Sequence, residues 1–469
     1  MKNGTKNTDL TKSSAWFDAV IVDEKPSRTS GLIFALLTAV LVFAPLAYGS
    51  VDAWALGINT ILLTLAALLW IFESWRTGEF RFSSNPLQLP VIGLILIGLV
   101  QLLPLRAPEI PAETLSAVPT EALSLDPQAT RFAIVQIALY LVFFAAALVF
   151  VRTQKRLRML VSVIITFGAA MAFFGILQRL MSADSIFGIR TVQNAIPFAT
   201  FINQHHFAAF MEMTAGLTLG LLYSQSTKKD KRLLLWIAVV IMGCALIFTG
   251  SRGGLLSFLG VVGFITLANF LLKSKDERNG QASFFSSHFG LVGGGLALIF
   301  VIFGLVLFLG GDQSLMRGVG INTSQDASNG RFHFWSAAIQ IIRDHPLLGA
   351  GLDAFGAAFT RYDTWNGTFR VEQAHNDYLQ IFADAGVFGF ALAVWFIYLL
   401  FKKSLPIIRR ASDRFRRGVA TGALAGCFGV LLHSFFDFPL RTPSNMFYFL
   451  TLAAIATVSI SYPKLYKKS

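Results

Sequence analysis

The sequence predicts an all-α integral membrane protein with about 12 transmembrane helices and one large, structured extramembrane loop. Two observations lead to this class. Of the 469 residues, 54% are hydrophobic and only 14% are charged, whereas soluble proteins carry about 25% charged residues. The apolar residues also fall in blocks of about 17 to 25, which is the length that an α-helix needs to cross a bilayer core.

The predicted spans follow one another along the whole chain after a polar N-terminal segment. They cover approximately residues 31–48, 53–72, 87–105, 132–151, 159–181, 197–223, 233–249, 254–272, 289–309, 378–401, 418–436 and 445–461. Pairs of glycines four residues apart, Gly216/Gly220 and Gly422/Gly426, predict close helix–helix contacts in two of these spans.

Charge in the connections supports this order of spans. Alternate connections are rich in Lys and Arg, as in "RTQKRLR" (152–158), "KKDKR" (228–232) and "KKSLPIIRRASDRFRR" (402–417). Such connections face the cytoplasm, so both termini are expected there. The net charge of +13 is therefore interpreted as a topology signal, and no nucleic-acid partner is predicted.

The topology divides the chain into five parts. Residues 1–30 form a cytoplasmic tail without the features of a cleavable signal peptide, 31–309 contain the first nine spans, 310–374 form the large outer loop, 375–462 contain the last three spans, and 463–469 form a second cytoplasmic tail. Cys244 and Cys427 lie within spans and are interpreted as packing residues.

The large outer loop contains a predicted amphipathic helix over residues 329–344. Phe332, Trp335, Ile339 and Ile342 share one helical stripe, and Asn329 is suited to cap the N-terminus. We expect this helix to lie on the outer membrane surface or over a cavity. "HPLLGAGLDAF" (345–355) then predicts a turn.

Polar residues gather at the outer ends of several spans, in four short segments. "AHNDYLQIFADAG" (374–386) opens the tenth span, "GSRGG" (250–254) joins the seventh to the eighth, "FINQHHFAAFMEM" (201–213) opens the sixth, and "HSFFDFPLRTP" (433–443) follows the eleventh. The candidate functional residues within and near them are Asn203, His205, His206, Glu212, Arg252, Arg331, His375, Asn376, Tyr378, Asp437 and Arg441. Ionisable groups at membrane depth are costly and often functional.

Structural roles remain open alternatives for most of these residues. An arginine such as Arg252 can snorkel to lipid phosphates, and a buried carboxylate such as Glu212 has to pair or stay protonated. Asp437 and Arg441 are close enough in sequence to pair across a turn. Asp377, Gln380 and Asp384 lie near one helical face and are interpreted as a structural polar seam.

No metal site and no cofactor are predicted. His205 and Glu212 are seven residues apart, or about 10 Å along a helix, and no Asp-x-Asp or His-Glu-x-x-His motif occurs. The remaining arginines and histidines suit an anion, and diphosphate is the obvious anion in a membrane, since arginine binds phosphate oxygens bidentately.

Four segments together resemble the bacterial O-antigen ligase and polymerase superfamily. They are "NQHHFAAFMEM" (203–213), "GSRGGLLSF" (250–258), "GRFHFWSAAIQIIRDHPLLGAGLDAF" (330–355) and "AHNDYLQIFADAGVFG" (374–389), and they occur in the family's order within residues 195–440. The sixth-span motif departs from the commoner Asn-Pro-Asn-His-Phe form, and His206 is the aligned histidine.

The resemblance implies a fold related to the GT-C glycosyltransferases and metal-independent glycan transfer. A direct displacement in this transfer would invert the anomeric centre. It implies an inner-membrane enzyme whose outer, periplasmic face handles a glycan on undecaprenyl diphosphate. By motif, Arg252 and Arg331 would contact the diphosphate and His375 would sit at the reaction centre. We predict that His375 and Arg252 are catalytic. The predicted substrate-binding residues are Arg252, Arg331, His206, Asn203, Asn376, Tyr378, Glu212 and Arg441.

The acceptor is not defined by the residues. An O-antigen ligase passes the glycan to lipid A–core, and we favour it slightly. A polymerase passes the glycan to another lipid-linked repeat, and a protein O-oligosaccharyltransferase ranks third. A lipid-linked oligosaccharide transporter is the alternative from a different class, but it would not need a structured outer loop followed by a histidine-headed helix. Membrane lipids are the remaining expected partners.

Overall fold

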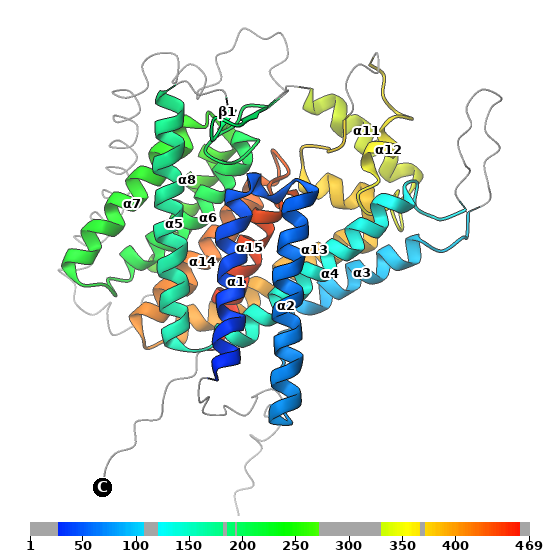
Figure 1. The fold of residues 1–469 in the computed structure, drawn as a ribbon. Helices are drawn as coiled ribbons and strands as arrows, with labels where there is room; N and C mark the ends of the chain where they lie inside the picture. Colours follow the sequence, from blue (N-terminus) through cyan, green and yellow to red (C-terminus); the bar gives the residue numbers. More distant parts are fainter. Residues whose placement is uncertain are drawn as a thin grey trace, which may run out of the picture.

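The computed structural model describes residues 27–106, 121–181, 185–192, 195–271, 330–365 and 371–459. These residues form a helical bundle with one short antiparallel hairpin, β1 (Ser185–Ile186) and β2 (Arg190–Thr191) (Figure 1). The α-helices are α1 (Arg28–Leu46), α2 (Ala53–Thr77), α3 (Gln88–Gln101), α4 (Pro127–Phe150), α5 (Gln154–Leu180), α6 (Gln204–Tyr223), α7 (Lys229–Phe248), α8 (Arg252–Leu271), α11 (Arg331–Asp344), α12 (Phe355–Phe359), α13 (Asp377–Arg410), α14 (Arg414–His433) and α15 (Pro443–Thr457). Two 3₁₀ turns, η1 (Tyr48–Ser50) and η2 (Pro439–Arg441), precede α2 and α15.

The predicted class of all-α membrane protein is confirmed. Among the described residues, eight helices are long and apolar enough to cross a membrane, namely α1, α2, α4, α5, α7, α8, α13 and α14. The shorter α3 and the helices α6 and α15 coincide with three further predicted spans. The predicted span over 289–309 lies outside the described residues, so the total of about 12 stays a prediction.

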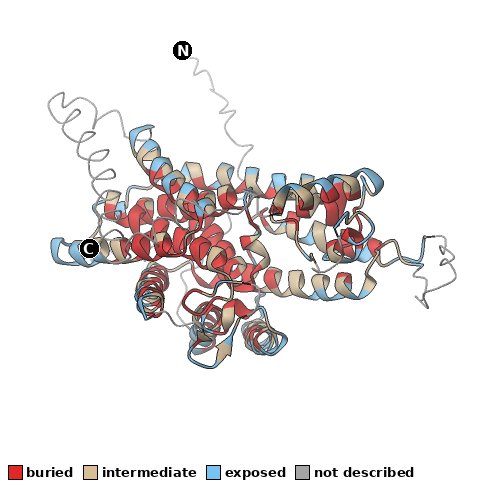
Figure 2. Ribbon diagram, turned by 90° about the horizontal axis from the view of Figure 1, so that it is seen from above, coloured by how far each residue is buried: buried red, intermediate tan, exposed pale blue. Residues whose placement is uncertain are grey.

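Helices α6 and α14 are buried along most of their lengths, and buried residues gather at the centre of the bundle (Figure 2). Glycines allow their backbones to touch, as the glycine spacing predicts. A Cβ on Gly220 would lie 2.4 Å from the Cα of Gly422, and one on Gly216 would lie 2.9 Å from the backbone nitrogen of Gly426. The two pairs therefore interlock with each other, and a Cβ at Gly216 or Gly220 would clash with the backbone of α14.

The periphery of the bundle remains apolar. On α2, the side chains of Ile61, Leu68 and Ile71 are all more than half exposed. In a soluble protein such a surface would be a liability, but against lipid tails it carries no penalty. The exposed faces therefore agree with a helix in contact with the bilayer.

Basic connections and candidate site residues lie at opposite ends of the bundle. Gln154 donates to Asp413 at 3.3 Å, which brings the start of α5 beside the connection between α13 and α14. A Cβ on Gly418 would lie 2.3 Å from the Oγ of Ser224, so the end of α6 reaches the same region. The β-hairpin, α11 and α12 lie at the other end (Figure 1).

The outer helices are anchored to a break in α13. Gly386 has φ 64°, and the peptide groups freed there bind the turn after α11. Val387 donates to the carbonyl of Pro346 at 2.9 Å, and Ala350 donates to the carbonyl of Ala383 at 2.8 Å. The side chain of Gln101 adds a third connection, because its Nε2 donates to the carbonyl of Asp384 at 2.8 Å. The break, which the apolar pattern does not predict, fixes the outer segment onto the bundle.

The amphipathic helix α11 begins at Arg331, and its N-terminal cap is Gly330 with φ 79°. Asn329, the predicted cap, lies outside the described residues. Two members of the predicted apolar stripe are exposed, Phe332 at 71% and Ile339 at 43%, while Trp335 and Ile342 are partly buried against the cluster beneath the helix. The buried face consists of Phe334, Ala337, Ala338 and Ile341. The helix thus has two apolar faces, and packing selects the one whose alanines permit close approach.

Candidate active site

The polar residues that open α13 mainly dock this helix onto the end of α14. Asn376 caps α13 by accepting from Tyr378 and Leu379 N–H groups, while its Nδ2 donates to the carbonyl of Phe435 at 3.1 Å. Ser434 Oγ donates to Asp377 at 2.7 Å. The Tyr378 hydroxyl donates to the carbonyl of Leu431 at 2.7 Å. These bonds fix the position of the neighbouring residue, His375.

His375 is the residue of this motif that turns toward a buried carboxylate. Its backbone adopts a left-handed conformation, with φ 51°, which is uncommon for a non-glycine residue and concentrates at functional sites. Its Nδ1 lies 3.3 Å from Oδ1 of Asp437, a side chain that is 1% exposed. Arg331 lies 3.7 Å from the other oxygen, Oδ2. Asp437 therefore links two predicted site residues from elements far apart in sequence.

The environment of Asp437 keeps its carboxyl ionised. Burial raises its pKa, but the contact with His375 and the charges of the neighbouring histidines outweigh burial and hold the pKa well below its usual range. An ionised carboxylate only accepts hydrogen bonds, so the proton of a neutral His375 belongs on Nδ1. The Nε2 of His375 is then left as a proton acceptor.

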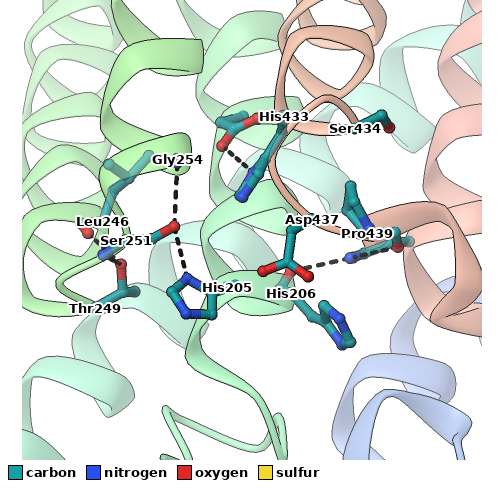
Figure 3. A network of polar contacts seen from close by, with 12 residues as sticks. His205, His206, Leu246, Thr249, Ser251, Gly254, His433, Ser434, Asp437 and Pro439 are labelled. Carbon is teal, nitrogen blue, oxygen red and sulfur yellow. Dashed lines mark hydrogen bonds and ion pairs between the residues drawn. The ribbon is translucent and has the colours of Figure 1, made fainter. Parts of the chain in front are cut away.

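Two further histidines reach this carboxylate from the start of α6 (Figure 3). His205 Nδ1 lies 2.9 Å from the Ser251 hydroxyl. His206 Nδ1 lies 2.6 Å from the Thr442 hydroxyl, and its buried Nε2 has no hydrogen-bond partner among the described residues. The Phe438 ring lies edge-on to both His206 and His375, with centroids 4.8 and 4.7 Å away. The sequence motif "NQHH" therefore does meet the His375 motif in space.

Asn203 and Arg252 lie at helix N-termini around this cluster. Asn203 caps α6 by accepting from the His205 N–H at 2.8 Å. Arg252 is the first residue of α8 and is exposed. Within the described part of the chain, no hydrogen bond or ion pair engages its guanidinium. A cation at the start of a helix adds to the positive end of the helix dipole, an arrangement that favours anion binding.

Glu212 lies deeper, nearly two turns along α6 from the two histidines. It is fully buried, and its Oε1 lies 2.8 Å from Nδ1 of His433, itself 1% exposed. The expectation that Glu212 must pair or stay protonated is met by this partner. His433 is the last residue of α14 and the first residue of the segment 433–443, and it is not among the candidates predicted from the sequence, although it lies four residues before Asp437.

Arg441 is held by carboxylates other than Asp437. It contacts Asp353 at 2.8 Å and also pairs with the buried Asp384. The alternative that Asp437 and Arg441 pair with each other is therefore wrong, because the 3₁₀ turn η2 directs them to opposite sides. Burial alone would lower the pKa of Arg441, but the charges of Asp384 and Asp353 outweigh burial and raise the pKa above its usual range. The polar seam expected along α13 is present, since Gln380 Nε2 also donates to Asp384 at 3.3 Å.

A cavity of about 370 Å³ lies on the other side of the α13 N-terminus. Its walls are mostly apolar side chains from α3, α4, α13 and α15, such as Leu94, Ile137 and Phe449. Its polar end includes Gln136, Gln373, Tyr378 and Ser434, besides the paired charges of Asp353 and Arg441. This combination suits an apolar chain that ends in an uncharged, hydroxylated group.

No group of three or more His, Cys, Asp or Glu side chains in the described ranges is arranged to hold a metal ion. Metal-independent chemistry nevertheless stays a prediction. What the described side chains supply is a set of cationic groups at one end of the bundle, a histidine with a free Nε2, and a neighbouring amphipathic cavity.

Fold and site together define a polytopic membrane protein with a histidine- and arginine-rich site at one end of its bundle. Residues 237–394 match the family model described as O-antigen ligase. The resemblance to the O-antigen ligase and polymerase superfamily is thereby confirmed over about a third of the chain, including Arg252, Arg331 and His375. The α6 motif and the Asp437 turn lie outside the matched residues. No curated protein matches the chain at a significant level.

Proposed function

We propose that this protein transfers a glycan from undecaprenyl diphosphate to an acceptor hydroxyl at the outer face of the bacterial inner membrane. The observation that carries the proposal is the buried Asp437 carboxylate, which joins His375 at 3.3 Å and Arg331 at 3.7 Å. Both partners lie in the segment that matches the O-antigen ligase model. The match to this family supports a lipid-linked glycan as the substrate class, and undecaprenyl diphosphate as the carrier is our proposal.

In the proposed reaction, the acceptor oxygen attacks the anomeric carbon of the donor and the bond from that carbon to the diphosphate oxygen breaks. The electron pair of the broken bond stays on undecaprenyl diphosphate. The acceptor proton moves to Nε2 of His375, while Asp437 stabilises the imidazolium that forms. Direct displacement inverts the anomeric centre, and no metal ion takes part.

Cationic side chains favour the transition state because charge builds up on the departing diphosphate. We assign this role to Arg252 and Arg331, since a guanidinium binds phosphate oxygens bidentately and keeps its charge. His205 and His206 add hydrogen-bonding groups on the same side. His375 is the proposed base, although the same imidazole, once protonated, would also stabilise diphosphate.

The amphipathic cavity supports a lipid-linked acceptor. Of the charged side chains that line it, Arg441 contacts Asp353 at 2.8 Å, and Asp377 accepts from Ser434 Oγ at 2.7 Å. The apolar walls suit a lipid chain, and the polar lining residues suit a sugar hydroxyl. We favour lipid A–core, the acceptor of an O-antigen ligase. A lipid-linked repeat, the acceptor of a polymerase, is the alternative.

Two measurements test this function. Purified protein given a lipid-linked glycan and an acceptor should release undecaprenyl diphosphate, whereas a transporter would release none. In a deletion strain, uncapped lipid A–core together with intact lipid-linked polymer identifies a ligase, and accumulated single repeats identify a polymerase. Absence of any release with both acceptor types would reject the proposed reaction.

A further inference from the structure

Glu212 is an ionisable side chain in an unfavourable place. It is completely buried in α6, and its Oε2 has no hydrogen-bond partner within the described residues. A Cβ on Gly429 of α14 would lie 3.6 Å from that oxygen, so α14 passes close beside it. Burying a carboxylate is costly even when it is paired. An apolar residue would avoid this cost, which indicates that the carboxylate serves more than packing.

The partner of Glu212 is placed at the junction of three helices. His433 ends α14, and its Nδ1 lies 2.8 Å from Glu212 Oε1 (Figure 3). The opposite edge of its ring lies against α8, since a Cβ on Gly253 would be 3.2 Å from Cδ2 and 3.4 Å from Nε2 of His433. Gly253 is also tight against Phe436, whose Cβ would be 3.1 Å away. An added side chain at Gly253 would therefore be in tight contact with this ring and with Phe436, and these neighbours would have to move to make room for it.

Gly253 directly follows Arg252, so the ring of His433 supports the hairpin that carries this arginine. The other side of the hairpin is held by Ser251, whose Oγ lies 2.9 Å from Nδ1 of His205 and accepts from the Gly254 N–H at 3.1 Å. The hairpin is therefore clamped between a histidine from α6 and a histidine from α14. His433 also accepts the N–H of Asp437 at its carbonyl, at 3.1 Å. One residue thus contacts both the Arg252 hairpin and the turn that carries Asp437.

We propose that Glu212 and His433 form a positioning pair, in which Glu212 orients the imidazole of His433 and His433 sets the Arg252 hairpin at the site. The pair lies outside the residues that match the family model. The inference rests on the proposed function, because it assumes that Arg252 binds diphosphate. It predicts that changes at Glu212, His433 or Gly253 act on donor binding through Arg252.

The test measures binding of undecaprenyl diphosphate to purified protein in lipid nanodiscs. Gly253→Ala places a methyl group against the His433 ring and leaves every polar group in place. Glu212→Gln keeps a side-chain oxygen for the His433 Nδ1–H but removes the charge. We expect each variant to weaken binding by about tenfold, which is the effect of one misplaced charged hydrogen bond, and to leave acceptor KM unchanged.

Gly263→Ala is the matched control on the same helix, since a Cβ there has no atom within 4 Å. It should bind like the wild type. Combining Gly253→Ala with Arg252→Ala should weaken binding no further than Arg252→Ala alone, because both changes remove the same contact. Thermal unfolding of each variant identifies those that fail to fold. If Glu212→Gln does not fold, Gly253→Ala still tests the proposal.

Two results would overturn the inference in different ways. If Arg252→Ala weakens binding while the folded Gly253→Ala and Glu212→Gln bind normally, the positioning role alone is wrong. If Arg252→Ala itself binds normally while wild-type transfer is intact, the diphosphate contact assigned to Arg252 is wrong and the positioning role falls with it. Absence of transfer in the wild type would instead reject the proposed function.

Discussion

Nδ1 of His375 lies 3.3 Å from Oδ1 of Asp437, and the carboxylate is 1% exposed while the imidazole is 32% exposed. The buried carboxylate of Asp437 can therefore fix the orientation of the His375 ring, while the ring itself is accessible to a substrate. A carboxylate behind a histidine is a common way to set the tautomer of a general base. Because the carboxylate also lies near Arg331, its loss should disturb two site residues at once.

Replacing Asp437 with Asn should lower turnover by about 10²–10⁴-fold, which is the usual contribution of a positioned general base. The amide keeps the shape of the carboxylate but does not force the proton of His375 onto Nδ1. Steady-state transfer at saturating donor measures the effect, with thermal unfolding as the control for folding. A folded variant with wild-type turnover would show that His375 works without this carboxylate.

The pH dependence of transfer should not report Asp437. A carboxyl whose pKa is depressed in the folded state contributes stability above its unfolded pKa, and that contribution is lost only as pH falls through the lower folded value. The unfolded value is about 3.9, and the folded pKa of Asp437 lies below its usual range. An acid limb of the rate profile between about pH 5 and 7 should thus come from histidine. The limb should persist in Asp437→Asn, and its disappearance there would contradict this assignment.

Helix packing offers a prediction that is independent of function. Gly220→Ala should destabilise the protein by about 1–3 kcal/mol, since the added methyl group would meet the Gly422 backbone, which cannot move aside. Gly57→Ala on α2 is the control, because a Cβ there has no atom within 4 Å. Thermal unfolding in detergent compares the two variants. Equal stability of both would mean that α6 and α14 are less tightly packed than their glycines indicate.

The glycine pairs also illustrate what the sequence could predict. Spacing of small residues and lengths of apolar blocks are local signals, and they identified most of the described helices and two helices that make close contacts, α6 and α14. They did not, however, show that the two glycine pairs face each other. The meeting of His375 with Asp437 and of Glu212 with His433 likewise depends on segments 62 and 221 residues apart, for which a single sequence holds no local signal. The same reason explains the partners of Arg441. Periodicity did not choose between the two apolar faces of α11, because Phe332 and Phe334 are equally apolar and only packing separates them.

Arg441 provides a case in which stability and binding can be separated. Arg441→Leu leaves Asp384, which is completely buried, without its cation. Partial exposure of Arg441 softens the loss, and we expect a destabilisation of up to about 3 kcal/mol. Arg441→Leu combined with Asp384→Leu should recover most of it. If Arg441→Leu instead lowers affinity for undecaprenyl diphosphate with unchanged thermal stability, Arg441 binds the donor as the sequence first suggested.

Transfer should continue in excess chelator. The proposed reaction uses arginines, where many glycosyltransferases use a divalent ion, to balance the charge of the departing diphosphate. Initial rates with and without chelator, after dialysis against chelator, measure this directly. A loss that magnesium or manganese restores would show that a metal ion takes part and would make Asp437 a candidate ligand.

Substitutions of Arg252 and His375 should affect different quantities, donor affinity and turnover, although both residues stabilise one transition state. Arg252→Lys keeps a positive charge at the start of α8 but loses the planar two-pronged contact, so affinity for the donor should fall substantially. His375→Ala should lower turnover by about 10²–10⁴-fold with donor affinity largely intact. The double variant should lose less than the product of the two single losses, because groups that stabilise one transition state are not additive. Transfer rate and donor affinity, measured for both single variants and the double at matched expression, test all three statements.

Near-normal transfer by folded His375→Ala would remove this histidine from the chemistry. Unchanged affinity and turnover in Arg252→Lys would reduce Arg252 to a replaceable charge, and the bidentate contact would then belong to Arg331, the other arginine that we assign to the diphosphate.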